Sequence, residues 1–463
     1  MIERSMRRVV LGAGWRETGQ DRRAQAIFMV SAVTLVAGLL IGGASRLDPV
    51  GHMAVQLAGV ALLGPAMLRT DIARADQALP MSILSAMVLL PLLQLAPLPP
   101  GVWMELPGHG PMARAVALAD LPEHWRPMTL SPADTQRALL SLIAPAALFL
   151  AVAPMGARQR ASLTMLVVGA GILGLVVAAI QAAGGEAGYL RWRPLAPIGQ
   201  PLGFFVNRNH QAIFLLSASV LAAALARTEP TPGRPVFRPA VALILMALLV
   251  VGALATLSRA GVLLAGPALA GGFLVLRSPR RGDAFGGRAL AWSAALTAMA
   301  TLIAMIVLAK GGLILDRFEN GQGGGRLQLL PQVLDLARLH QPLGAGLGSF
   351  DLVYRAAERL EDIDPFYLNH AHNDFAELWL EAGWPGLALI VSFLAWWGLA
   401  LRQQWFGALN DPLGRAGTLV IGLLLLHSLV DYPLRTPAMA LVMALACALA
   451  TRSAPPRAAT CAA

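Results

Sequence analysis

Two histidines stand shortly before a hydrophobic segment in the C-terminal part of the chain. His370 and His372, the latter followed by Asn373, precede the apolar run 387–401. Ionisable residues are rare so close to an apolar segment, because a charge costs roughly 2.5–3.5 kcal/mol on membrane-insertion scales. An imidazole ordinarily titrates at about pH 6.5, which suits histidine to proton transfer near neutral pH. This segment therefore indicates chemistry at the boundary between lipid and water.

Arginines elsewhere in the chain could bind an anion at the same boundary. Arg259 lies between two apolar runs with almost no loop, so it either extends to the membrane surface or binds a phosphate with its planar guanidinium. Arg326 follows a run of glycines, which lets the backbone approach a ligand, although a solvated loop charge is the alternative. Asn207 and Arg208 precede a further apolar run, where they either form interfacial hydrogen bonds or attract an anionic, lipid-linked substrate.

The elements that must position these side chains are predicted to be membrane helices. The chain has 463 residues, of which 56% are hydrophobic and 13% charged, and its mean hydropathy is +0.62. A soluble protein carries about a quarter charged residues, so a soluble fold is excluded. Apolar runs of about 20 residues, each long enough to cross the hydrocarbon core, recur along the chain. We expect an all-α polytopic membrane protein with about twelve transmembrane helices, at 24–44, 50–68, 78–97, 136–154, 161–183, 205–226, 239–257, 260–276, 289–309, 384–401, 416–431 and 436–451.

The basic residues predict how the chain is oriented. Lys310 is the only lysine among the 36 basic residues. With the N-terminus in the cytoplasm, every short inside loop is basic, whereas the short outside connections at 45–49 and 432–435 carry one arginine each. This orientation puts a large loop, 310–376, outside the membrane between spans 9 and 10. The net charge of +10 therefore reflects membrane topology and not binding to nucleic acid.

Several motifs follow one another along the second half of the chain. They are Phe205–Ala212, Leu257–Gly261, Arg326 with Pro342–Phe350, His372–Asn373 with Glu381–Gly386, and His427 with Asp431–Leu434. In this order they resemble the O-antigen ligase and O-antigen polymerase (Wzy-type) superfamily of bacterial inner-membrane glycosyltransferases. Each motif is degenerate alone, but their order and their agreement with the outward-facing loops make the set specific. The N-terminal third resembles the family mainly as a hydrophobic scaffold.

The resemblance implies a glycosyltransferase that joins a glycan from an undecaprenyl-diphosphate-linked donor to an acceptor hydroxyl, with no cofactor and no obligatory metal. Arg259 and Arg326 match the family's arginines that hold the donor diphosphate and stabilise the leaving group. His372 matches the histidine that activates the acceptor hydroxyl as general base. His370, two residues earlier, departs from the family pattern and is the alternative base. Many relatives also carry an aromatic residue shortly after the loop arginine, where this chain has leucines.

The resemblance also predicts the partners and the division of the chain. Asn207, Arg208 and Asn373 are expected to contact the substrate at the periplasmic face of the inner membrane, among membrane lipids. The acceptor is a glycan or a lipid A-core sugar, and ligase and polymerase stay open because both use the same donor. The expected parts are N-terminal membrane helices at 1–200 with a periplasmic loop at 98–135, a catalytic core at 201–435 that includes periplasmic loop 310–376, and the last span with a cytoplasmic tail at 436–463.

Two other classes of function stay open as alternatives. An ion-coupled transporter usually places charged residues near the middle of the membrane. The expected spans contain no central carboxylate, and Glu377 and Glu381, spaced i, i+4, are expected to cap a helix in solvent. A non-catalytic polysaccharide-assembly protein is harder to exclude by composition, but it has no reason to gather arginines and histidines on one face.

The orientation gives a labelling prediction. A cysteine introduced at Asp283 should react only from the cytoplasmic side, and one introduced at Gln322 only from the periplasmic side, because arginine-rich loops stay inside. The measurement is labelling with a membrane-impermeant maleimide in intact cells and in inverted vesicles. Labelling of both positions from the same side would contradict the topology.

Overall fold

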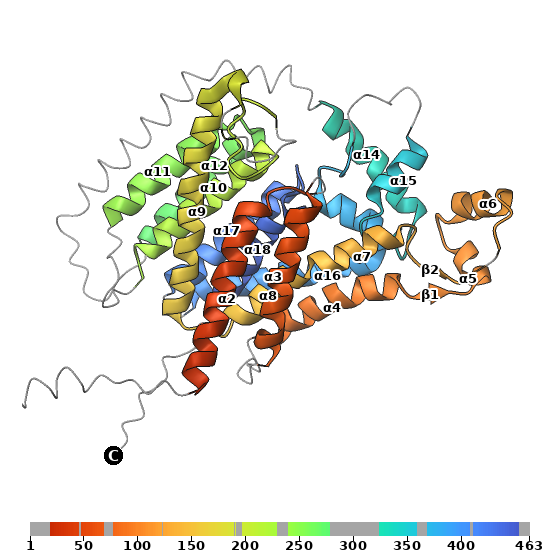
Figure 1. The fold of residues 1–463 in the computed structure, drawn as a ribbon, viewed down its shortest axis with the longest axis horizontal. Coiled ribbons are helices and arrows are strands. Elements are labelled where there is room, and N and C mark those ends of the chain that lie inside the picture. Colours follow the sequence, from red (N-terminus) through yellow and green to blue (C-terminus); the bar gives the residue numbers. More distant parts are fainter. Residues whose placement is uncertain are drawn as a thin grey trace, which may run out of the picture.

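The computed structural model describes residues 19–45, 48–68, 77–122, 124–188, 190, 197–228, 239–277, 324–358, 368–407 and 411–452. These residues form a bundle of α-helices (Figure 1). The sheet found in this part of the chain is minimal, because strand β1 (Pro97–Leu98) pairs antiparallel with strand β2 (Arg126–Pro127) over two residues each.

Among the described residues, six helical segments are long and apolar enough to cross a membrane, which indicates a multi-pass membrane protein. Four shorter apolar helices accompany them. Every expected span coincides with helix in the structure except 289–309, which lies outside the described residues. The long segments are α2 (Gly19–Ile41), α3 (Pro49–Met67), α7 (Pro132–Ser141) continued by α8 (Ile143–Val152), α9 (Ala157–Gly184), α12 (Arg259–Leu276) and α16 (Asp374–Phe406), and the shorter ones are α4 (Ala78–Gln94), α11 (Pro239–Ala255), α17 (Pro412–Ser428) and α18 (Pro437–Ala450).

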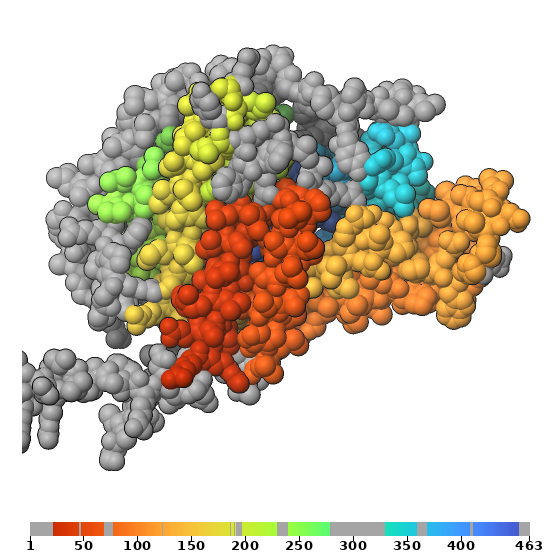
Figure 2. All heavy atoms as spheres, in the orientation of Figure 1, coloured from red at the N-terminus to blue at the C-terminus, as the bar shows by residue number. Residues whose placement is uncertain are grey.

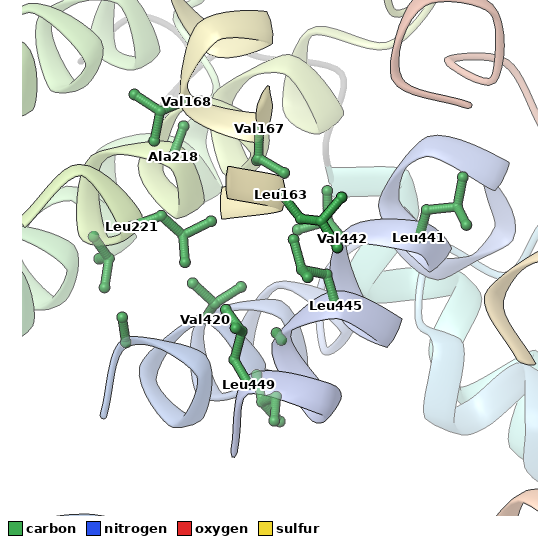
Figure 3. Packing of buried hydrophobic residues seen from close by; sticks show 14 of the residues in the cluster. Leu163, Val167, Val168, Ala218, Leu221, Val420, Leu441, Val442, Leu445 and Leu449 are labelled. Carbon is green, nitrogen blue, oxygen red and sulfur yellow. The ribbon is translucent and has the colours of Figure 1, made fainter. Parts of the chain in front are cut away.

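Helix α10 (Arg208–Leu225) is the centre of the bundle. Every residue from His210 to Leu225 is buried, and the helix packs against α9, α11, α12 and α17. Small residues allow the close approach, since Gly261 of α12 faces Ala212, and Gly171 of α9 faces Ala218. Larger side chains of α9, α10, α17 and α18 fill the space beyond these contacts (Figure 3). A helix that is apolar all round, apart from its first turn, is expected in such an interior position.

One end of the bundle collects several helix termini, and we call it the site end. Helix α2 ends there, where the backbone of Gly42 and Gly43 accepts hydrogen bonds from Ala438 at the start of α18 and from Val206 before α10. Gln181 near the end of α9 is buried, and its amide oxygen accepts from the backbone N–H groups at 202 and 203. The chain entering α10 is therefore fixed by α2, α9 and α18 together.

Further short helices lie beyond the site end. Helices α14 (Gly324–Leu339) and α15 (Phe350–Ala357) pack on the first turns of α16 around a small apolar core that includes Leu329, Val333 and Phe350. Gln94 at the end of α4 joins this layer to the bundle, because its side chain donates to the carbonyl of Glu381 and accepts from the N–H of Leu347, both at 2.9 Å.

A protruding arm, residues 97–127, carries α5 (Pro100–Glu105) and α6 (Gly110–Leu118) between strands β1 and β2. In Figure 2 it forms the orange right-hand edge of the molecule, next to the cyan region of α14 and α15. The arm is anchored by two buried histidines. His109 donates a hydrogen bond from Nδ1 to the carbonyl of Trp103 at 3.0 Å, and His340, which directly follows α14, packs against Gly108, where a Cβ would overlap its ring.

The anchoring histidines make the position of the arm sensitive to pH. Burial lowers the pKa of both His109 and His340 below the ordinary value of about 6.5. The folded arm therefore disfavours their protonated forms, so its docking is strongest above that value and weakens as the pH falls below it. Hydrogen exchange of residues 100–119, corrected for intrinsic rates, should rise between about pH 7.5 and about pH 5.5. The rise should be smaller in His340→Gln, and equal protection at both pH values in the wild type would contradict this account.

Candidate active site

The loop that carries the two predicted histidines is held by the start of α16. Asn373 is the N-cap of that helix, and its side-chain oxygen accepts from the backbone N–H groups of Phe375 and Ala376 at 3.0 Å each. The amide nitrogen of the same side chain donates to the carbonyl of Leu429 at 2.9 Å. Asn373 therefore ends the loop, starts the helix and joins both to the end of α17. This contact network gives the predicted substrate-binding residue a structural role.

His372 adopts a backbone conformation that is uncommon for a residue with a Cβ, with φ at 52°. Its Nδ1 lies 3.2 Å from Oδ1 of Asp431, whose side chain is completely buried. Asp431 also accepts from the side-chain amides of Asn207 and Asn209, at 3.2 Å and 2.6 Å. The carboxylate thereby ties the histidine loop to the first turn of α10.

The electrostatics of this pair favour a charged carboxylate. Burial alone raises the pKa of Asp431, but the hydrogen bond from His372 and the charges of nearby histidines, His210 and His427 among them, bring it well below its usual range. The ionised form of Asp431 binds Nδ1 of His372 and leaves Nε2 on the opposite side of the ring. Within the described residues, Nε2 of His372 forms no hydrogen bond. Such an aspartate–histidine pair can take a proton from a bound hydroxyl.

His370 is placed differently from His372. Its Nδ1 lies 2.8 Å from Oε1 of Glu377, and the second oxygen of Glu377 accepts from the backbone N–H of Ala371 at 2.8 Å. The Nε2 atom of His370 is buried and has no hydrogen-bond partner among the described residues. The ring of Tyr432 lies between the two histidines, with its centroid 4.3 Å from that of His370 and 4.9 Å from that of His372. The two histidine side chains are almost equally covered, at 11% and 14% exposed, and they differ in their carboxylate partners, Glu377 for His370 and Asp431 for His372.

A cluster of largely buried charged side chains lies next to the histidine loop, at the start of α16. Arg435, in the short 3-10 helix η5 (Pro433–Arg435), lies 3.5 Å from Asp374, 3.5 Å from Glu377 and 3.0 Å from Glu381. Burial works against its charge, but the surrounding carboxylates raise the pKa of Arg435 above its usual value. The prediction that Glu377 and Glu381 are solvated caps is wrong, because their side chains are 1% and 0% exposed and Arg435 binds both.

The predicted anion-binding arginines stand at helix starts. Arg208 and Arg259 are the first residues of α10 and α12, whose first turns pack together where Gly261 faces Ala212. The N-termini of two neighbouring helices supply positive potential and backbone N–H groups, and both arginines add charge there. Each helix has a side-chain cap, Asn207 on α10 and Ser258 on α12.

The structure brings some of the predicted residues together and leaves one undetermined. Asp431 joins Asn207 to His372, Asn373 follows His372 in the same loop, and the His370 ring lies beside them against Tyr432. Arg208 and Arg259 stand at the starts of α10 and α12. The backbone of Arg326 lies in the first turn of α14, but the structure does not describe its side chain.

Sequence reasoning assigned no role to Asp431, Asn209 or Arg435. The motif from Asp431 to Leu434 and the single arginine of the connection 432–435 were the available signals, and only the fold shows that they face the histidine loop. Within the described ranges, no group of three or more His, Cys, Asp or Glu residues is arranged to hold a metal ion.

Together, the fold and this site define a multi-pass helical membrane protein with an aspartate–histidine pair and helix-terminal arginines at one end of its bundle. The comparison with protein families agrees with this class. The O-antigen ligase family model (Wzy_C) matches residues 244–391, so the chain carries an O-antigen ligase family domain that includes Arg259, both loop histidines and the buried glutamates of α16. A search of curated proteins finds no match to the chain.

Proposed function

We propose that the protein transfers a glycan from an undecaprenyl-diphosphate-linked donor to an acceptor hydroxyl, as an O-antigen ligase or a polysaccharide polymerase of the inner membrane. The observation that carries the proposal is the buried Asp431–His372 pair beside the first turn of α10. The family domain at 244–391 supports a lipid-linked glycan as substrate. Positive-inside topology supports a site that faces the periplasm.

In the proposed reaction the acceptor oxygen attacks the anomeric carbon of the donor sugar, and the bond from that carbon to the diphosphate oxygen breaks. His372 takes the proton of the acceptor hydroxyl on Nε2 as the new bond forms. Asp431 holds the ring through Nδ1 and stabilises the positive charge that the ring acquires. The lipid diphosphate leaves with an additional negative charge.

Arginines are proposed to neutralise that leaving group in place of a divalent metal. Arg259 and Arg208 stand at adjoining helix N-termini, so the backbone dipoles and the guanidinium groups act in the same direction. Arg326 is proposed as a further arginine that binds the donor diphosphate. A guanidinium presents a planar fork that matches two phosphate oxygens, which an ammonium group does not.

The positions of the buried glutamates of α16 do not favour the function of a transporter. Glu377 and Glu381 are buried, but both bind Arg435 at the site end instead of lining a path through the middle of the bundle. A transporter would move the donor without cleaving it, so release of lipid diphosphate by the purified protein distinguishes the two functions.

The proposed base gives the first prediction on activity. Replacing His372 with alanine should lower turnover by about 10²–10⁴, because acid–base catalysis is lost. His370→Ala should cost less, since its ring is enclosed against Glu377 and Tyr432. The measurement is release of undecaprenyl diphosphate by purified protein in proteoliposomes with donor and acceptor. An inactive His370→Ala beside an active His372→Ala would reverse the assignment, and full activity in both would exclude a histidine base.

The proposed diphosphate clamp gives the second prediction. Arg259→Lys and Arg326→Lys should both strongly impair transfer, because lysine keeps the charge but loses the planar fork. Arg338→Lys is the matched control, since that side chain is 74% exposed and pairs only with Asp335 of its own helix. Rates are measured in the same proteoliposomes, with circular dichroism as a check on folding. Wild-type rates in both lysine variants would end the clamp hypothesis.

A further inference from the structure

Glu377, in the first turns of α16, binds the histidine loop in a way that neither its burial nor helix capping explains. Glu377 accepts hydrogen bonds from both residues that precede His372, through Oε1 from His370 and through Oε2 from the Ala371 backbone, each at 2.8 Å. It therefore binds the loop on the N-terminal side of His372. On the C-terminal side, Asn373 binds the start of α16 and the end of α17.

The two anchors, Glu377 and Asn373, hold the chain on either side of His372, which has a left-handed backbone. His372 has φ at 52°, which a residue with a Cβ keeps only where its surroundings fix it. Both anchors belong to the same helix, because Asn373 caps α16 and Glu377 lies one turn further along it. The turn of the chain at His372 is therefore attached on both sides to one helix, α16.

Arg435 fixes the anchor in turn. The guanidinium lies 3.5 Å from Oε1 of Glu377, the oxygen that binds the His370 ring. Its other contacts, Asp374 and Glu381, are also on α16. A glutamate buried beside two further carboxylates is unfavourable without such a counter-charge. Asp431 belongs to the same segment after α17 as Arg435. This segment therefore binds the ring of His372 through Asp431 and binds Glu377, the anchor of the His372 backbone, through Arg435.

We propose that Glu377, held by Arg435, is a positioning residue that imposes the backbone conformation of His372 and so aims its imidazole at the acceptor. This inference rests on the proposed function, because it gives His372 the role of base. Glu377 itself touches no reacting atom. His370 then serves as part of the anchor, which accounts for a second histidine in the loop whose Nε2 has no partner among the described residues.

The test is a double-mutant cycle between Glu377 and His372. Glu377→Gln keeps the shape and the acceptor for Ala371 but removes the charge that binds His370 and Arg435. We expect kcat to fall by about tenfold to a hundredfold, the cost of a small misplacement of a catalytic group, with the donor KM within about twofold of wild type. In the His372→Ala background the same substitution should produce no further loss, because no base remains to be positioned.

Each outcome separates positioning from stability. Losses that multiply in the double variant, or a KM that rises as kcat falls, would overturn the positioning role and leave the base assignment in place. Wild-type turnover in His372→Ala alone would overturn the base and this proposal together. Arg338→Gln, at an exposed ion pair, is the control for the loss of one charge.

A second variant covers the case in which Glu377→Gln does not fold. Arg435→Lys keeps a positive charge but cannot reach all three carboxylates with a planar fork. It should lower kcat less than Glu377→Gln, by up to about tenfold, and should likewise have no effect in the His372→Ala background. An Arg435→Lys variant with unchanged kcat and normal expression would exclude the arginine from the anchor.

Discussion

The arrangement of the site depends on one buried carboxylate. Asp431 accepts hydrogen bonds from His372 and from Asn207 and Asn209, so a single side chain joins segments that are more than two hundred residues apart in the sequence. A carboxylate without partners in this position would be very unfavourable, and the donors around it supply the necessary stabilisation. Because its partners come from α10 and from the loop before α16, the position of each helix constrains the other. The helix-terminal arginines of α10 and α12 are consequently fixed relative to the histidine loop.

A second group of charged side chains depends on the same short segment of chain that carries Asp431. Arg435 lies four residues beyond Asp431 and binds three carboxylates of α16. The short segment 431–435 therefore supplies opposite charges to two partners, the carboxylate of Asp431 to the ring of His372 and the guanidinium of Arg435 to α16. This alternation allows many ionisable groups to share a small volume at the membrane boundary. Within the described residues, each of these four carboxylates has a basic partner, His372 for Asp431 and Arg435 for the three carboxylates of α16.

The sequence predicted the helices well and the internal connections of the site only in part. Long apolar runs located the helices, because hydrophobicity over about 20 residues depends little on tertiary context. The order of the motifs indicated the O-antigen ligase family, whose model matches residues 244–391. The role of Asp431 could not be read in the same way, since a carboxylate after an apolar run is equally consistent with a solvated helix end. Glu377 and Glu381 were misread for this reason, because i, i+4 spacing shows a shared helix face but not what covers it. Only the fold shows that Arg435 lies there.

The enclosure of α10 has a consequence for how the protein is made. Its first turn is polar, and every residue from His210 onward is covered by protein. Such a helix gains little from contact with lipid and is held in the membrane by neighbours on both sides in sequence. Its partner Asp431 is synthesised much later, just before the final helix. A nascent chain carries Asn207 while a further 224 residues are synthesised before its carboxylate partner Asp431 appears. The pair that orients the ring of His372 is therefore complete only once the segment after α17 has been synthesised, and a shorter nascent chain has no carboxylate at this position to bind Nδ1 of His372.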